Sequence, residues 1–296
     1  MIVVKLMGGL GNQMFQYAAA RRAAWRRATV LKLNLSFLEK DQPGNTPRRF
    51  ALGELNISAT RASRWEVARI SCQGRNVLES AGLRVLQRVG LAGRGQLFKE
   101  KQFGFDPTLL AAPDNSYLEG YWQSERYFQD IAPLIAEEFT VRRPLCGKDL
   151  ELAQLMQATQ AVSLHVRRGD YVSAAAVNAF HGACPINYYL AAVQVMASRL
   201  GSPHFFLFSD DPEWLRAHLK LQYPTTVVEH NGAQEGHQDL RLMSLCKHHI
   251  IANSSLSWWG AWLSGHAQKT VIAPRKWFND PSVDTSDLIP GGWLRL

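Results

Sequence analysis

The sequence predicts an α/β protein with two domains, each built on a parallel β-sheet covered by helices. Short apolar runs alternate with helical segments in both halves of the chain, which is the pattern of parallel sheets. The 296 residues suffice for two domains of ordinary size. The periodicity breaks at 141–147, so we place the domains at 1–145 and 146–296, with the last segment a candidate to pack back on the first domain.

In the first domain, we expect a strand at 2–6, a glycine turn, a helix at 13–26 and a second strand at 30–33. The glycines interrupt the first apolar stretch too early for a signal sequence or a membrane span, and no other run reaches spanning length. Residues 72–95, rich in arginine and glycine, give no clear assignment.

In the second domain, strands and helices alternate without interruption, as parallel pairing requires. We expect strands at 162–166, 204–208, 225–228, 249–252 and 270–273, and helices at 187–200, after Pro212, at 239–247 and from Ser254.

Composition and charge limit the function classes. Hydrophobic residues make up 46% and charged residues 20%, as in globular enzymes, and a net charge of +8 with pI ≈ 9.5 favours an anionic ligand. The cysteines at 72, 146, 184 and 246 form no Cys-x-x-Cys pair, which disfavours a disulfide framework or zinc ribbon and favours a reducing compartment.

The segment 161–170 carries the strongest functional signal, because an apolar run ends in two adjacent arginines, a glycine and an acid. Burying two guanidinium groups at a strand end is costly unless they meet anions. Strand alternation places His165 and Arg167 on one face and Arg168 on the other. We expect Arg167 to meet the ligand and Arg168 to pair with an internal carboxylate such as Asp170; the alternative is a solvated basic turn.

The glycine-rich turn after the first strand resembles a dinucleotide-binding fingerprint but lacks two of its features. The third glycine would fall at Met14, and Lys32 and Asn34 stand where an acid should meet a ribose. Glycines before a helix still let backbone N–H groups approach an anion. The candidate ligand contacts are Gly9, Gly11, Asn12 and Gln13. Alternatively, Asn12 only caps the helix.

Two adjacent acids, Asp210 and Asp211, follow the strand at 204–208. Asp211 before Pro212 fits a helix cap and a first helical position. A divalent-metal site is the alternative, but the Asp-x-Asp spacing and a partner ligand are missing. We therefore expect structural roles.

The last cluster begins at 253–255, where Asn-Ser-Ser follows a strand and opens a helix. Free N–H groups and small hydroxyls then lie at the sheet edge where ligands bind. Asp239 could accept hydrogen bonds from guanine, or cap its own helix. Trp258, Trp259 and Trp262 follow helical spacing, which predicts core positions rather than a sugar platform.

Six segments, in order, resemble signatures of the inverting α-1,2-fucosyltransferases of glycosyltransferase family 11. They are GGLGNQMFQYA at 8–18, YLEGYWQSERYF at 117–128, HVRRGDYV at 165–172, HGACPINYY at 181–189, FSDDP at 208–212 and NSSLSWWGAWL at 253–263. They span nearly the whole chain. The resemblance implies a GT-B architecture, two Rossmann-like domains facing a cleft, with GDP-β-L-fucose in the second and the acceptor toward the first.

The resemblance also implies residue roles and partners. His165 would contact the nucleotide, Arg167 the diphosphate and Asp239 the guanine, while Ser254 and Ser255 would bind nucleotide or phosphate oxygens. The acceptor would be the 2-OH of a terminal β-galactoside in an oligosaccharide or glycolipid, with no nucleic-acid partner. The family further implies a cytoplasmic protein, with peripheral association at the inner face of the cytoplasmic membrane.

The expected chemistry is direct displacement at the anomeric carbon, which turns a β-linked donor into an α-fucoside. Arg167 and helix N-termini would stabilise the leaving diphosphate without a metal or other cofactor. Glu125, Asp170 and His181 are the candidates for removing the acceptor proton. The alternatives are a fucosyltransferase of another linkage, a polyanion-binding protein, disfavoured by scattered cations, and a nucleotide-sugar oxidoreductase, disfavoured by the incomplete fingerprint.

Overall fold

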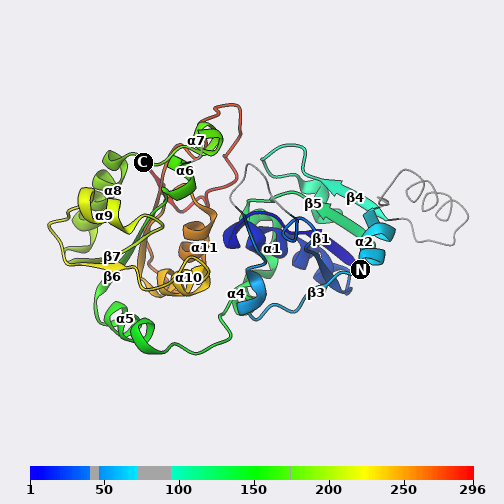
Figure 1. Cartoon of the computed structure of the whole chain (residues 1–296), viewed down its shortest axis with the longest axis horizontal. Helices are drawn as coiled ribbons and strands as arrows, with labels where there is room; N and C mark the ends of the chain where they lie inside the picture. The colour runs from blue at the N-terminus through cyan, green and yellow to red at the C-terminus, as the bar shows by residue number, and fades with distance from the viewer. Residues whose placement is uncertain (41–46, 72–94, 174) are drawn as a thin grey trace, which may run out of the picture. The chain divides into compact units, whose positions relative to one another are not determined.

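Figure 1 shows the computed structural model, which describes residues 1–40, 47–71, 95–173 and 175–296. The chain divides into two units, Met1–Phe139 with Asp284–Leu288, and Thr140–Val283 with Ile289–Leu296. Each unit contains one parallel sheet with helices, which confirms the predicted fold class, two Rossmann-like α/β units as in GT-B. The unassigned segment at 72–94, which includes Cys72, and the Asp170 side chain lie outside the described residues.

In the described part of unit 1, five parallel strands have the order β3-β2-β1-β5-β4. The strands are β1 (Ile2–Lys5), β2 (Leu31–Asn34), β3 (Thr60–Arg61), β4 (Gln96–Lys99) and β5 (Ser116–Glu119). The helices are α1 (Leu10–Arg26), α2 (Arg64–Ser71) and α4 (Ala132–Glu138), with 3-10 turns η1 (Leu52–Glu54), η2 (Pro107–Ala111), η3 (Glu125–Tyr127) and η4 (Gln129–Ile131). The strand order reverses between β1 and β5, and parallel α/β sheets bind ligands at the carboxyl ends of such strands.

The glycine turn sets where α1 begins. Gly8 has φ +74°, in the left-handed region that favours glycine, and a Cβ on it would lie 2.5 Å from the Asn12 Nδ2. Gly9 is the N-cap of a helix that starts at Leu10, three residues before the expected start. Asn12 therefore lies inside the helix, and the interpretation that it caps α1 is wrong.

In the described part of unit 2, six parallel strands have the order β11-β10-β9-β6-β7-β8. The strands are β6 (Gln160–Val166), β7 (Pro203–Ser209), β8 (Thr225–Val228), β9 (His248–Ile250), β10 (Val271–Ala273) and β11 (Leu294–Arg295). The helices are α5 (Gly147–Ala158), α6 (Gly169–Ser173), α7 (Ala175–His181), α8 (Ile186–Leu200), α9 (Pro212–His218), α10 (Gly236–Leu245) and α11 (Ser255–Leu263). Here the strand order reverses between β6 and β9.

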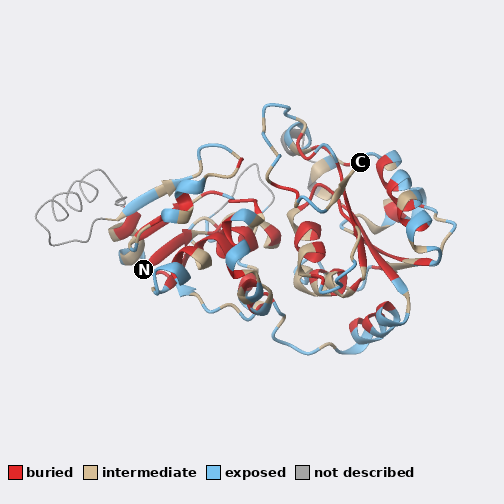
Figure 2. Ribbon diagram, turned by 180° about the vertical axis from the view of Figure 1, so that it is seen from behind, coloured by how far each residue is buried: buried red, intermediate tan, exposed pale blue. Residues whose placement is uncertain are grey.

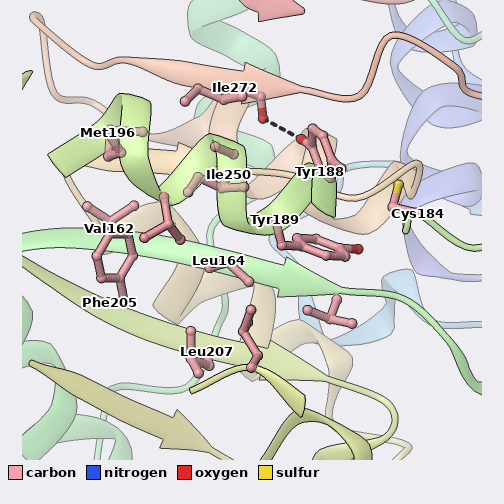
Figure 3. Packing of buried hydrophobic residues seen from close by; sticks show 14 of the residues in the cluster. Val162, Leu164, Cys184, Tyr188, Tyr189, Met196, Phe205, Leu207, Ile250 and Ile272 are labelled. Atoms are coloured by element: carbon pink, nitrogen blue, oxygen red, sulfur yellow. Dashed lines mark hydrogen bonds between the residues drawn. The ribbon is translucent and has the colours of Figure 1, made fainter. Parts of the chain in front are cut away.

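Strand alternation divides the core of unit 2 between the two faces of its sheet. The even-numbered residues of β6 from Val162 to Val166 pack against α8, where the Tyr188 hydroxyl donates to the carbonyl of Ile272 at 3.2 Å (Figure 3). Ala161 instead packs with residues of α5 and α10. The predicted alternation is thereby confirmed. Each buried aliphatic side chain of such a core stabilises the fold by about 1.5–3 kcal/mol.

The buried residues of each unit are concentrated in the central strands of its sheet (Figure 2). Trp258 and Trp259 of α11 are fully buried, which confirms their predicted core positions. Of the described cysteines, Cys146, Cys184 and Cys246 are free thiols. Within the described residues, no helix is both long enough and apolar enough to cross a membrane.

Candidate functional site

The strongest candidate site lies at the switch point of unit 2, where β6 and β9 end side by side. The loop after β6 carries Arg167, and the loop after β9 leads through Asn253 into α11. The Tyr171 hydroxyl donates to the carbonyl of Asn253 at 3.3 Å, which joins the two loops. Two of the segments singled out in the sequence are therefore brought together at a ligand-binding edge.

Asp210 holds the arginine turn in place. One carboxylate oxygen lies 2.8 Å from a guanidinium nitrogen of Arg167, and the other accepts the backbone N–H of Arg168 at 2.8 Å. A Cβ on Gly169 would lie only 2.4 Å from the first oxygen, so this position requires glycine. Sequence reasoning gave Asp210 only a strand-end role, although parallel pairing of consecutive strands was a signal that these loops would meet.

Arg168 is held by a different set of contacts. Its guanidinium lies 4.0 Å from the ring centroid of Trp214, and its Nε lies 3.5 Å from a carboxylate oxygen of Asp211. Asp211 also caps α9, as predicted, by accepting the backbone N–H of Trp214 at 3.1 Å. Asp211 is thus one internal carboxylate that pairs with Arg168, and the expected pairing with Asp170 lies outside the described residues. Because both arginine side chains are only about one-fifth exposed, the solvated-turn interpretation is wrong.

His165 is a buried, neutral imidazole at the end of β6. Burial lowers its pKa to about 4, with Asp210 raising the pKa and Arg167 lowering it further. Its Nδ1 has no hydrogen-bond partner among the described residues. A buried polar atom without a partner is rare in folded proteins, and a bound ligand is one way to satisfy it.

In the segment 253–255, Asn253 has a structural role and the two serines form the start of α11. The Asn253 amide donates to the carbonyls of residues 181–182 and of Trp277 at 2.8–3.1 Å, so Asn253 fixes local structure. Ser254 is the N-cap of α11 but makes no side-chain capping bond, and no acidic residue occupies the first turn. The start of α11, with Ser254 and Ser255, therefore combines two hydroxyls with the positive end of a helix, which suits an anion.

Of the three candidates for the catalytic base, the structure brings His181 to this edge. Its ring stacks on Tyr171 at 4.7 Å between centroids, and the guanidinium of Arg167 lies 5.4 Å from the same tyrosine ring. Glu125 belongs to η3 of unit 1. The side chain of Asp170 lies outside the described residues.

Asp239 lies in the first turn of α10, near the end of β8. The helix begins at Gly236 with Glu235 as its N-cap, so the interpretation of Asp239 as a cap is wrong. Burial raises its pKa to about 6, while a 2.8 Å hydrogen bond from the Asn231 amide acts in the opposite direction. The result is a mostly buried carboxylate with capacity for a further donor.

The side chain of Gln13, in the first part of α1, fixes the glycine loop of unit 1 by hydrogen bonds. Gln13 is fully buried, and its amide donates to the carbonyls of Gly8 and Arg49, both at 2.8 Å. Its oxygen accepts the backbone N–H of Ala51 at 2.9 Å. These bonds give Gln13 a structural role, although the sequence offered it as a ligand contact. Of the other candidates offered here, Gly9 caps α1, and Gly11 and Asn12 lie in its first turn.

Comparisons with known proteins identify the family of the chain. A model of glycosyl transferase family 11 matches residues 101–296. An alpha-1,2-colitosyltransferase of Escherichia coli is 34% identical over 100% of this chain and 98% of its own length. The O-antigen biosynthesis glycosyltransferase WbnK of Escherichia coli is 33% identical over 98% of this chain and 99% of its own. The galactoside 2-alpha-L-fucosyltransferase Sec1 of Mus musculus is 28% identical over 49% of this chain and 41% of its own. With a family model over more than half of its length and two relatives aligned end to end, the chain belongs to glycosyl transferase family 11.

Proposed function

We propose that this glycosyltransferase is an inverting α-1,2-fucosyltransferase that moves L-fucose from GDP-β-L-fucose to the 2-OH of a terminal β-galactoside. The observation that carries the proposal is the pair of loops at the β6/β9 switch point. One loop presents Arg167, fixed by Asp210, and the other presents the start of α11. The relatives named for transfer in α-1,2 linkage and for galactoside fucosylation support the linkage and the acceptor.

Charge development explains why this arrangement suits glycosyl transfer. As the bond to the donor sugar breaks, negative charge builds on the diphosphate, and a fixed cation stabilises that charge more than it stabilises the ground state. Arg167 is preorganised for this by its ion pair with Asp210. The acceptor hydroxyl attacks from the opposite side, which inverts the β-linked donor into an α-product. His181 is our first candidate for accepting its proton.

Donor recognition is assigned to buried polar groups. Neutral His165 has an Nδ1 that lacks a partner among the residues described and can bond the nucleotide. The carboxylate of Asp239 can accept two hydrogen bonds from the N1–H and amino group of guanine. Bases that lack these donors would leave its oxygens unpaired, which discriminates strongly against them.

We further propose that no metal takes part. Asp210 and Asp211, the acids seen to contact the arginine turn, already bind Arg167, Arg168 and the start of α9. The positive charge that a metal would supply comes from Arg167 instead. Activity is therefore expected to persist in excess EDTA. A strict requirement for Mg²⁺ or Mn²⁺, restored by adding the ion back, contradicts the proposal.

The central experiment is transfer with defined substrates. The enzyme is incubated with GDP-fucose and a β-galactoside, GDP release is measured, and the linkage is read from the NMR spectrum of the product. GDP-linked colitose tests the donor sugar suggested by one relative's name. Absence of GDP release from GDP-fucose contradicts the fucosyltransferase proposal, whether or not GDP-linked colitose is used, and a product of another linkage corrects the acceptor hydroxyl.

A further inference from the structure

Asp239, the residue proposed above to recognise guanine, belongs to a small polar group made by three segments of unit 2. Asn231 comes from the loop between β8 and α10, and Asp149 comes from the first turn of α5. The two helices pack on each other through apolar side chains such as Met156 and Met243. This packing brings two carboxylates that are distant in sequence to the same side-chain amide.

The amide of Asn231 is closer to one of these carboxylates than to the other. It donates to Oδ1 of Asp239 at 2.8 Å, whereas it lies 3.5 Å from Oδ1 of Asp149, at the limit of a hydrogen bond. The Oδ1 of Asp149, a buried residue, already accepts a hydrogen bond from Nε2 of His230 at 2.8 Å. His230 therefore satisfies Asp149, and Asn231 holds Asp239.

Hydrogen bonds also fix the loop that carries Asn231. The carboxylate of Glu235 accepts the backbone N–H of Gly232 at 2.7 Å, and the N–H of Glu235 donates to the carbonyl of Gly232 at 2.8 Å. The backbone N–H of Gln238 donates to the carbonyl of Glu235 at 2.7 Å, which joins the loop to the first turn of α10. Because the loop is closed against the helix that carries Asp239, the Asn231 amide has a defined position beside that carboxylate.

The hydrogen bond from Asn231 limits the rotation of the Asp239 carboxylate. An ionised carboxylate has about four acceptor positions, and this bond uses one of them. Guanine presents two adjacent donors, the N1–H and the 2-amino group, which two carboxylate oxygens can accept together. A carboxylate that is already oriented loses less freedom when it binds both donors, so the orientation favours a base that has them.

The same hydrogen bond affects the charge of Asp239. Burial, and then the charges of Asp149 and Glu235, raise the pKa of Asp239, which reaches about 6. The Asn231 amide is the largest influence that lowers this pKa, and the charge of His230 is the next. Loss of the amide therefore raises the pKa of Asp239 further, and a protonated carboxyl accepts fewer hydrogen bonds than a carboxylate.

We propose that Asn231 is a positioning residue for nucleotide specificity, which orients the carboxylate of Asp239 toward the paired donors of a guanine base. The inference rests on the proposed function, because it takes Asp239 to be the residue that recognises the base of the donor nucleotide. His230 assists by binding Asp149, which leaves the amide of Asn231 to Asp239.

Base selectivity is tested by calorimetric binding of GDP, IDP and ADP. Hypoxanthine lacks the 2-amino group of guanine, and adenine lacks both that group and the N1–H, so the series separates the two donors. Asn231→Ala should reduce the preference for GDP over ADP at least ~10-fold. Asn231→Asp should reduce it more, because the isosteric carboxylate cannot donate and adds a like charge beside Asp239. Gln234→Ala, at an exposed position of the same loop, is the matched control and should keep wild-type selectivity.

Two readouts separate positioning from a purely structural role. In an Asp239→Ala background, Asn231→Ala should leave base selectivity unchanged, because its effect passes through the missing carboxylate. In the presence of Asp239, GDP affinity should begin to fall at a higher pH in both Asn231 variants than in wild type. This direction follows because a raised pKa requires a higher pH to ionise Asp239.

The possible failures are distinguishable from one another. Unchanged GDP selectivity in folded Asn231→Ala and Asn231→Asp overturns the inference, although wild type still prefers GDP. A loss of the same size in the Asp239→Ala background also overturns it and gives Asn231 a structural role. If wild type binds GDP, IDP and ADP equally, the guanine assignment of Asp239 fails and the inference fails with it, whereas transfer from GDP-fucose to a β-galactoside tests the proposed function separately.

Discussion

Replacing Arg167 by alanine is the most direct test of the site in unit 2. The guanidinium is 20% exposed and bound to Asp210, so its charge is fixed in place and only weakly screened by water. Removing one preorganised donor from a developing oxyanion costs about 2.7–4 kcal/mol, or about 100- to 1,000-fold in kcat. Because Asp210 already offsets part of this charge, we expect the lower end, about 100-fold.

Folding stability is expected to change much less than catalysis. The lost ion pair is partly exposed, and such pairs contribute about 1 kcal/mol or less. Asp210 also keeps its hydrogen bond from the backbone N–H of Arg168, so it is not left without a donor. A loss of 1 kcal/mol lowers Tm by about 2–4 °C in a chain of this size.

Steady-state measurement of GDP release gives kcat and KM, and thermal unfolding gives Tm for the same preparation. Arg216→Ala is the matched control. Arg216 lies on α9 and forms an exposed ion pair with Glu229, so its replacement removes the same charge from a pair outside the site. The control should keep wild-type kcat. If Arg167→Ala is folded and turns over near the wild-type rate, Arg167 does not stabilise the diphosphate and the reasoning fails.

Three further predictions concern neighbouring residues. Gly169→Ala places a Cβ 2.4 Å from Asp210, so the arginine turn must shift and kcat should fall at least ~10-fold; wild-type kcat would contradict this contact. With its pKa at about 6, Asp239 is neutral below that pH, so the KM for GDP-fucose should rise as pH falls through 6 in wild type but not in Asp239→Asn. Asp239→Ala should also weaken the preference for GDP over ADP as inhibitor, and unchanged selectivity returns the residue to a structural role. Asn253→Ala removes the amide that donates to three carbonyls, two of them in buried hydrogen bonds, so denaturant unfolding should show a loss of at least ~2 kcal/mol, while a stability like that of Ser254→Ala would refute this.

Periodicity in the sequence predicted most of the long elements but missed the twelve-residue helix α5 and several short strands. The strands around Val162 and Phe206 were located within two residues because each has a run of buried apolar side chains. The strands at 60–61 and 294–295 have two residues each, too few for any pattern. Helix starts were displaced at Leu10 and Gly236, because their N-cap residues, Gly9 and Glu235, are not the Ser, Thr, Asp or Asn that marks a start in sequence.

The candidate site was predictable where it depends on one segment. Alternation placed His165 and Arg167 together, and a cap followed by proline located the start of α9 at Asp211. The partner of Arg167 was missed, since Asp210 reaches it only because β6 and β7 pair in register. Likewise, no local signal connects Asp149 with His230, which meet because α5 packs against α10 beside the loop after β8.

The sequence by itself determined the parallel α/β class, the faces of the strands and the motif that links the chain to its family. These properties depend on local periodicity and on residues adjacent along the chain, where spacing fixes direction. The tertiary structure decided which acids hold which arginines, that Asn12 and Asp239 are not caps, and that two loops of unit 2 meet at a switch point. These contacts depend on strand order and register. Strand order and register arise from the burial of side chains that are distant in sequence, so no single segment specifies them.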